Sequence, residues 1–378
     1  MSRVDGPRSL AMREAVIFCG PVVEEGKPSR GGVESGNRRL VTLLSRMDYR
    51  VTELRYRQNG ANPWQKLRSY ALGFSAVILK LLVSGRRHRI FHIAPLTRIF
   101  LSAECCVMLT AKLAGLKIVT QLRTGSQISN YQSRSILYRM LYRTMIGLSD
   151  AVVCQGQTYV KFVRSLSPNE PCYFLPNFVF SEEIAGRAPR SMTGPRLAYV
   201  GSISESKGCL HAIRLLQELR RAAPQAELTL VGKQQSDFSQ LLAAEDKTNI
   251  IFTGPLGSAD FGRILDESHY FIFLTLWKGE GHSNALTEAM ARGCVPVATR
   301  HGFNDFILGD VGFLVSDRDD IAGIATRLLD HWGSGSWERD SLRARQRIER
   351  DFSDAAIRPT LERVYESLGE TKQARIHA

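Results

Sequence analysis

The chain has 378 residues, of which 44% are hydrophobic and 23% charged, and a formal net charge of +13. These proportions are close to those of soluble globular proteins and exclude a disordered or low-complexity chain, while the length predicts two domains. The charge is uneven, because residues 1–190 carry 28 Lys and Arg against 12 Asp and Glu. This basic half predicts an anionic partner, which is a membrane surface, a nucleic acid or a phosphorylated substrate.

The cysteines and the longest apolar stretches narrow the class further. The seven cysteines have none of the spacings of zinc sites or disulfide frameworks, so we expect reduced, mostly buried thiols. No secretion signal is predicted at the N-terminus, where a strand-length apolar run follows three arginines. The stretches 71–82 and 99–119 are too short or too charged to span a bilayer. We therefore expect a soluble or peripheral protein of the cytoplasm.

Short β-branched runs alternate with amphipathic stretches along the chain, a pattern typical of βαβ units and parallel sheets. The expected strands are 15–19, 51–54, 90–93, 117–122, 151–154 and 172–175 in the first half, and 197–200, 227–231, 249–252, 270–274, 295–298 and 312–315 in the second. We predict an α/β fold with two Rossmann-like, doubly wound domains that face each other across a cleft. Their limits are 1–180 for the basic N-terminal domain and 196–352 for the C-terminal domain, with a linker at 181–195. A C-terminal helix within 353–378 is expected to pack back across the domain junction.

The first candidate site follows the first strand. Ligands of open parallel sheets bind beyond the carboxyl ends of the strands. There, Gly31 and Gly32 lead into a helical pattern over 37–46, so their backbone amides can approach a phosphate at a helix N-terminus. A flexible surface turn is the alternative. The loop is neither G-x-G-x-x-G nor G-x-x-x-x-G-K-S, which disfavours a classical dinucleotide site and a P-loop NTPase.

The second candidate follows the first strand of the second half. Gly201 and Ser202 form a turn at the strand end, and Lys207 lies where the next helix begins. A lysine there can meet a phosphate as a point charge. The alternative is a solvated lysine, although a positive charge in the first helical turn opposes the helix dipole.

The most specific pattern lies between 277 and 293. Ser283 or Asn284 can cap a helix that ends at Gly293. This helix places Glu280 in the loop before its N-terminus and Glu288 one turn inside it. Two carboxylates at this end of a helix can accept hydrogen bonds from a vicinal diol, as found on ribose and hexoses. Pairing of Glu280 with the helix dipole is the structural alternative.

These residues resemble the group 1, or family 4, retaining glycosyltransferases, whose two-Rossmann-domain fold is called GT-B. Residues 280–290 resemble the family's E-x7-E motif, and 293–298 resemble the strand that follows it. Further matches support the resemblance in the expected order over about residues 15–370. They are Gly31-Gly32, Leu175-Pro176-Asn177, Val200-Gly201 with Lys207-Gly208, Leu230-Val231-Gly232, Phe252-Thr253-Gly254, Phe352-Ser353 and Tyr365.

The resemblance implies a metal-independent enzyme without a cofactor, whose substrate is a nucleotide sugar such as a UDP- or GDP-sugar. Glu288 would bind the ribose, Glu280 the transferred sugar, and Lys207 the diphosphate leaving group. The remaining donor contacts would come from Gly31, Gly32, Gly201, Ser202, Gly281, His282, Ser283, Asn284 and Leu286. The acceptor would be a glycan or lipid-linked molecule, in the synthesis of bacterial cell-surface polysaccharide or glycolipid.

Two positions depart from the family pattern. Ser202 replaces the arginine that usually lies beside the diphosphate, unless Arg123 or Arg30 supplies that charge. The family's His-Gly pair after the fourth strand is Arg123-Thr124-Gly125 here. Arg123 is therefore predicted at the site, as a donor to the sugar or the diphosphate. His92 is the nearest alternative imidazole, although a lone histidine near a strand end is more often structural.

Residues 62–89 mix apolar and basic side chains in a way that suits the interface of an anionic leaflet. The acceptor or membrane candidates are Trp64, Lys66, Arg68, Arg86, Arg87 and His92. We expect contact with the cytoplasmic face of a membrane; core helices with solvated basic faces are the alternative. A nucleic-acid-binding module is disfavoured because it would leave Glu280 and Glu288 without a role. A non-catalytic scaffold of the same fold, and a nucleotide-sugar epimerase or sugar-phosphate synthase, remain open.

Overall fold

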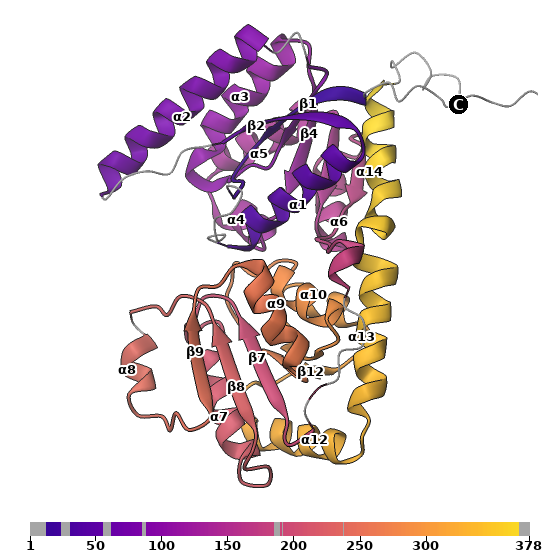
Figure 1. Cartoon of the computed structure of the whole chain (residues 1–378). Helices are drawn as coiled ribbons and strands as arrows, with labels where there is room; N and C mark the ends of the chain where they lie inside the picture. The colour runs from indigo at the N-terminus through magenta and orange to yellow at the C-terminus, as the bar shows by residue number, and fades with distance from the viewer. Residues whose placement is uncertain are drawn as a thin grey trace, which may run out of the picture.

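The computed structural model describes residues 13–23, 31–55, 62–84, 88–184, 190, 192–236 and 238–369. These residues form two parallel sheets of six strands each, stacked one above the other in Figure 1, so the predicted α/β fold is confirmed. Their strands coincide with the expected ones to within two residues, because each expected run is short, apolar and rich in β-branched residues.

The first sheet has the order β2-β1-β3-β4-β5-β6. Its strands are β1 (Arg13–Cys19), β2 (Tyr49–Leu54), β3 (Ile90–Ile93), β4 (Lys117–Leu122), β5 (Ala151–Cys154) and β6 (Cys172–Phe174). The helices of this half are α1 (Gly32–Arg46), α2 (Pro63–Ser84), α3 (Leu101–Leu113), α4 (Gln127–Ser133), α5 (Ile136–Leu148) and α6 (Gln157–Leu166), with the 3-10 turn η2 (Arg98–Phe100). One face of the sheet packs against α2, α3, α5 and α6, and the other against α1 and the C-terminal helix.

The second sheet has the order β12-β11-β10-β7-β8-β9. Its strands are β7 (Arg196–Val200), β8 (Glu227–Val231), β9 (Ile250–Gly254), β10 (Tyr270–Phe273), β11 (Val295–Thr299) and β12 (Phe313–Val315). The helices of this half are α7 (Cys209–Leu219), α8 (Phe238–Leu242), α9 (Ser258–Glu267), α10 (Asn284–Ala291), α11 (Asn304–Leu308), α12 (Ile321–Gly333) and α13 (Trp337–Phe352). Together they enclose one continuous apolar core.

The chain crosses between the two sheets twice, and the crossings are bonded to each other. The first runs through Val179 and the 3-10 turn η3 (Ser181–Glu183), and the second through Ser353, between α13 and α14 (Asp354–Gly369). Val179 N donates to Phe352 O at 3.0 Å, and Asp354 N donates to Val179 O at 2.9 Å. Figure 1 shows α14 running back along the first sheet, where Leu361 and Tyr365 join its core.

The cysteines are free thiols, and all but Cys106 are buried. Cys154 and Cys172 lie on neighbouring strands, with their sulfur atoms 3.7 Å apart. Both side chains fill the core of the first sheet, which accounts for their place in the sequence.

Candidate functional site

The second sheet reverses its strand order between β7 and β10, and the predicted site lies at this reversal. β7 pairs with β8 on one side and with β10 on the other, so the loops after β7 and β10 leave the sheet side by side. Lys207 follows β7 and Glu280 follows β10, and Lys207 Nζ lies 2.6 Å from Glu280 Oε2. Crevices at such reversals are where open α/β sheets bind their ligands.

The lysine and the glutamate are held from several sides. Lys207 Nζ lies 4.0 Å from the centre of the Trp277 ring, and Thr275 Oγ1 donates to Glu280 Oε2 at 3.3 Å. Their side chains are 17% and 10% exposed, so the pair is shielded from water but not fully enclosed. An ammonium group in such a position has already lost part of its hydration shell, so it can bind an anionic group at a lower cost of dehydration.

Helix α10 begins and ends as the sequence predicts. The Ser283 hydroxyl accepts from Leu286 N at 3.3 Å, which makes Ser283 the cap, and the helix is followed by Gly293 at a φ of +78°. The Leu286 side chain is fully buried in the core of the second sheet. Leu286 can therefore face a ligand only through its backbone, whose amide already serves the cap.

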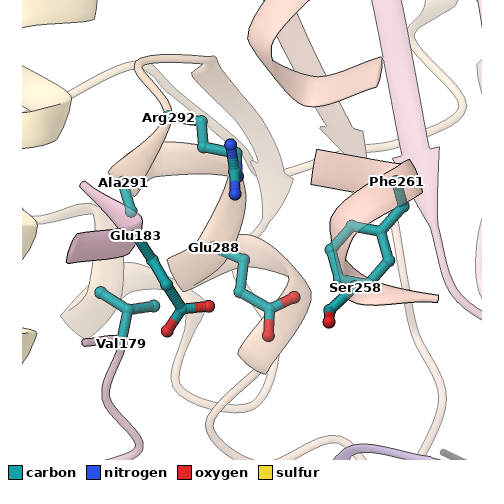
Figure 2. A pocket seen from close by; sticks show the side chains of 7 residues that line it. All are labelled: Val179, Glu183, Ser258, Phe261, Glu288, Ala291 and Arg292. Atoms are coloured by element: carbon teal, nitrogen blue, oxygen red, sulfur yellow. The ribbon is translucent and has the colours of Figure 1, made fainter. Parts of the chain in front are cut away.

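Glu288 lines a pocket between α10, α9 and the first crossing. The other lining residues are Val179, Glu183, Ser258, Phe261, Ala291 and Arg292. Figure 2 shows the carboxylates of Glu183 and Glu288 side by side, with the Phe261 ring of α9 on the other side of Glu288. A carboxylate opposite an aromatic ring offers a hydroxyl acceptor and a stacking surface in one recess.

Arg39 of α1 joins the two carboxylates. Its guanidinium contacts Glu288 Oε1 and donates to Glu183 Oε1 at 2.8 Å. Burial raises the pKa of Glu288, although Arg39 opposes the shift. For Arg39, burial alone would lower the pKa, but Glu288 and Glu183 raise it above its ordinary value. This triad connects the first half of the chain, the crossing and the second half.

The glycine turn after β1 meets α10 directly. Helix α1 begins at Gly32, just after Gly31, and Asn284 Nδ2 donates to Gly32 O at 2.7 Å and to Ser35 Oγ at 2.8 Å. The predicted contributors Gly31, Gly32 and Asn284 are therefore brought together across the cleft, near the N-terminus of α10.

The turn after β7 carries Gly201 and Ser202. Gly201 N donates to Val231 O at 2.9 Å, and Ser202 O accepts from the Tyr199 hydroxyl at 2.8 Å. The Ser202 side chain is exposed. Arg30, considered as a replacement for the missing family arginine, lies outside the described residues.

Arg123, predicted at the site, is buried between the two halves. Its Nη1 donates to Asn177 Oδ1 at 2.8 Å and its Nη2 donates to Gly36 O at 3.0 Å. Burial, and after it the charge of Arg39, lowers the pKa of Arg123 to about 9. Asn177 Nδ2 in turn donates to His282 O at 2.7 Å. The observed contacts of Arg123 are thus with the protein, and its contact with a ligand stays a prediction.

At the site, His282 and Gly281 present their backbone groups rather than side chains. The His282 ring packs edge-on against Phe352, with ring centres 5.2 Å apart, and burial followed by the charge of Arg123 lowers its pKa to about 3. A Cβ on Gly281 would lie 2.1 Å from Gln155 Nε2, so the two halves are in van der Waals contact here. The His282 ring is therefore neutral and turned into the protein.

His92 shows the arrangement of a structural histidine. Its ring is fully buried in β3, and Nδ1 lies 2.8 Å from the Tyr365 hydroxyl of α14. With its amide oxygen facing Arg123, Gln121 donates to His92 Nε2 at 3.2 Å and accepts from the guanidinium at 2.9 Å. Both ring nitrogens of His92 are therefore bonded within the protein.

Of the predicted acceptor or membrane residues, Trp64, Lys66 and Arg68 lie on α2, and His92 lies in β3. Trp64 is 80% exposed and Arg68 is exposed, whereas the side chain of Lys66 is not described and Arg86 and Arg87 fall outside the described residues. In the described parts of the chain, none of the helices has the length and apolarity needed to cross a bilayer. The described residues also contain no cluster of three metal-ligating side chains, and metal independence stays a prediction.

Arg39, Glu183 and Phe261 lie at the site without having been predicted from the sequence. The contact between Arg39 and Glu288 spans 249 residues, so no local spacing indicates it. Amphipathic periodicity places Arg39 on the polar side of α1 and says nothing of the acid opposite it. Glu183 lay in a segment without periodicity, which we interpreted as a linker.

Comparisons with known proteins bear on the family and the fold. Residues 194–331 match the family described as Glycosyl transferases group 1. An uncharacterized glycosyltransferase of Bacillus subtilis, YqgM, is 25% identical over 185 residues, which are 48% of this chain and 51% of that protein. The GDP-mannose:cellobiosyl-diphosphopolyprenol alpha-mannosyltransferase of Xanthomonas campestris is 24% identical over 199 residues, 50% of this chain and 51% of that protein. The matched region thus spans about half the length of each relative.

The fold is shared with solved structures over nearly the whole chain. Anabaena Alr3699/HepE, solved in complex with UDP and glucose, has a TM-score of 0.65 and covers 95% of this chain and 100% of its own, at 14% identity. At that identity the likeness concerns the fold. Residues 194–331 thus match the group 1 glycosyltransferases, and the chain as a whole shares the two-sheet architecture of the GT-B fold.

Proposed function

We propose that the chain is a retaining glycosyltransferase that moves a sugar from a UDP- or GDP-sugar to a hydroxyl of a glycan or lipid-linked acceptor. The observation that carries the proposal is the pair of Lys207 and Glu280 at the strand-order reversal of the second sheet, followed by helix α10, which bonds to the glycine turn of α1 through Asn284 and carries Glu288 into a pocket. The pathway would be bacterial cell-surface polysaccharide or glycolipid synthesis. We also propose the domain limits expected from the sequence, which are 1–180 and 196–352 with a linker at 181–195.

Each of the three residues has a role that its surroundings suit. Lys207 would bind the diphosphate, which carries more negative charge than the single carboxylate of Glu280 that the lysine contacts without a ligand. Glu280 would then accept hydrogen bonds from hydroxyl groups of the transferred sugar. Stabilising the charge that develops on the leaving diphosphate is the main catalytic task of such a site. No protein nucleophile is assigned.

The nucleoside would occupy the pocket beside Glu288. The Glu288 carboxylate would accept hydrogen bonds from the ribose hydroxyls, and the base would lie toward the Phe261 ring. The names of the similar proteins contain both GDP-mannose and UDP, so both bases are tested.

A thermal-shift series with UDP, GDP, ADP and CMP tests the donor site. We expect one nucleoside diphosphate to raise Tm saturably and Glu288→Ala to abolish the rise. Glu267→Ala is the matched control, because Glu267 is an exposed glutamate of α9 in the same half. No shift with any nucleotide would favour the non-catalytic scaffold. Interconversion of donor sugars without an acceptor would favour an epimerase.

We further propose peripheral contact with an anionic membrane at its cytoplasmic face, through the outer surface of α2, α3 and α5. This outer surface presents exposed apolar side chains: Leu72, Leu79, Leu82 and Val83 of α2, Leu109 and Leu113 of α3, and Ile136, Leu137 and Met140 of α5. Each of them is about half exposed or more, and several follow one helical stripe. A concentration of exposed apolar side chains on adjacent helices is typical of an interaction site.

The charge of the outer surface matches an anionic leaflet. Between Glu53 and Asp150 the sequence has 15 Lys and Arg and a single acid, Glu104, which is buried. Arg68, Lys80 and Arg139 are exposed among the apolar side chains. Basic residues beside a membrane contribute about 1 kcal/mol each to binding an anionic surface.

Flotation with phosphatidylglycerol-containing and pure phosphatidylcholine vesicles tests the membrane contact. We expect binding to the anionic vesicles at low salt, and its loss in Leu79→Glu/Leu113→Glu. Leu342→Glu is the matched control, since Leu342 is an exposed leucine on α13 of the other half. Equal binding to both vesicle types would refute the contact.

A further inference from the structure

Arg39 occupies a position that the proposed reaction does not assign. It projects from α1 toward Glu288 of α10 and Glu183 of η3. The exposed fractions of the Arg39 and Glu288 side chains are 11% and 10%, so the ion pair is largely removed from water. A buried ion pair of this kind is costly to form unless both partners are well placed.

The charges around Glu288 define what Arg39 does. Arg39 faces it from α1, Glu183 from η3, and Arg292 from its own helix. Arg292 is already bound, since its Nη1 lies 2.7 Å from Asp266 Oδ2. On the side of α13, Arg345 approaches Gly293, beyond the far end of α10. Arg39 is thus the cation that separates the two neighbouring carboxylates.

Without that cation, two acids would meet in a largely buried recess. Burial and Glu183 both disfavour the charged form of Glu288, and Arg39 opposes them. A neighbouring carboxylate in such a site disfavours the charged form of Glu288 further. A protonated Glu288 would lose half of its capacity to accept hydrogen bonds from hydroxyl groups.

The geometry leaves Glu288 available to a ligand. Arg39 contacts Oε1 of Glu288, and the guanidinium is not among the groups that line the pocket. Glu183 is fixed independently, because its Oε2 accepts from Phe180 N at 2.8 Å. The recess thus faces one side of the carboxylate and Arg39 the other.

We propose that Arg39 is a positioning residue for the donor, which holds the Glu288 carboxylate charged and aimed into the pocket from the opposite half of the molecule. This inference rests on the proposed function, in which Glu288 binds the ribose. It adds that donor affinity depends on how α1 is seated against α10, where Asn284 bonds to Gly32 and Ser35.

The test compares nucleotide affinity in Arg39→Met and Arg39→Lys at pH 6 and pH 8, by calorimetry with UDP and with GDP. We expect Arg39→Met to weaken binding about tenfold or more at pH 6, with partial recovery at pH 8 as Glu288 loses its proton. Arg39→Lys should restore most of the affinity and the wild-type pH profile, because it returns the charge.

Arg38→Met is the matched control on the same helix. Arg38 pairs with Glu53 at 2.7 Å and does not contact Glu288, so its removal should leave the affinity and its pH profile unchanged. If both variants weaken binding alike and without pH dependence, the effect comes from α1 itself and the inference is overturned. Wild-type affinity and pH profile in Arg39→Met also overturn it.

A readout without ligand separates this inference from the proposed function. Urea unfolding of Arg39→Met, Glu288→Gln and the double variant gives the coupling between the two residues. We expect a clear coupling at pH 8 that shrinks at pH 6, and no coupling at either pH would overturn the inference. If the wild type binds neither nucleotide, the proposed function fails, whatever the coupling.

Discussion

Replacing Gly125 by alanine tests how tightly the two halves must close over the site. Gly125 follows β4, and its Cα lies against the backbone of the loop that carries Glu280. A Cβ at this position would lie 2.0 Å from Glu280 O and 2.7 Å from Gly279 O. Both contacts are to backbone atoms, so no side-chain rotation can relieve them.

The size of the effect follows from these distances. Cβ atoms essentially never come within 3.0 Å of another heavy atom, so a 2.0 Å contact requires the loop and the first half to separate by roughly 1 Å. The displacement falls on Glu280 and its partner Lys207. A misplacement of about 1 Å in a closed site can cost on the order of 100-fold in rate. The loss of stability should be smaller, about 1–3 kcal/mol, because loops can shift.

Steady-state transfer kinetics with the donor found by thermal shift would measure the effect, and urea unfolding would show that the variant is folded. Gly147→Ala is the matched control, because no neighbouring group lies within 4 Å of a Cβ at that exposed position of α5. We expect Gly147→Ala to keep wild-type kcat/KM and Gly125→Ala to lose most of it. Wild-type kcat/KM in a folded Gly125→Ala protein would refute the idea that the halves must be in contact during transfer.

Three further predictions follow from single contacts. Lys207→Ala should raise the activation free energy obtained from kcat/KM by roughly 2–4 kcal/mol, because it removes a charged contact in a shielded site. Lys247→Ala is the exposed-surface control, and an equal loss of kcat/KM in both variants would contradict the prediction. Burial raises the pKa of Glu104 to about 7, so its contribution to stability is present in acid and is lost as pH rises from about 4.5 to 7. The unfolding free energy of the wild type relative to Glu104→Gln should therefore fall by up to about 3 kcal/mol across that range in urea titrations, and a flat difference would contradict the shift. Tyr365→Phe should cost about 1 kcal/mol of unfolding free energy, because it leaves buried His92 Nδ1 without its 2.8 Å partner; His92→Phe/Tyr365→Phe should then cost less than the two single losses added together.

The sheets and the helix that carries Glu288 could be predicted because their information is local. A buried parallel strand is a short apolar run, and β3, β4, β5 and β8 have the predicted bounds. Ser283 caps α10 by bonding an amide three residues later, which sequence spacing reveals directly. Such features require no knowledge of the rest of the fold.

The partners of the site residues could not be predicted because they come from distant segments. The sequence pairs Glu280 with Glu288 as two acceptors, yet each of them faces a cation, Lys207 or Arg39. Likewise, the backbone around His282 is predicted at the site, but the ring turns inward against Phe352, which lies 70 positions later on α13. Which side of a loop faces the protein is decided by packing between elements, and one sequence does not contain that pairing.

Arg123 and His92 show how a residue near the site can act without reaching a ligand. A buried hydrogen-bonded chain runs from Tyr365 through His92, Gln121 and Arg123 to Asn177, and ends on the carbonyl of His282. It begins on the helix that returns across the first sheet and ends on the loop that precedes α10. Because partly satisfied buried networks are costly, a displacement at either end is opposed along the whole chain.

The hydrogen-bonded network from Tyr365 to His282 and the Arg39 triad connect the same two halves of the molecule at different places. Near Val179 and Ser353 the two crossings are bonded to each other, so we expect a relative motion of the halves to be a rotation about that point. Such a rotation leaves the backbone bonds of the crossings in place and separates Asn284 from Gly32 and Arg39 from Glu288, which are polar contacts that water can replace. Opening would also part aromatic contacts between the halves, Tyr159 with Phe303 and Phe174 with Phe306, each pair with ring centres 5.3 Å apart. It would remove the cation from the proposed ribose carboxylate. Donor binding and closure of the cleft would then favour each other, as reciprocal linkage requires.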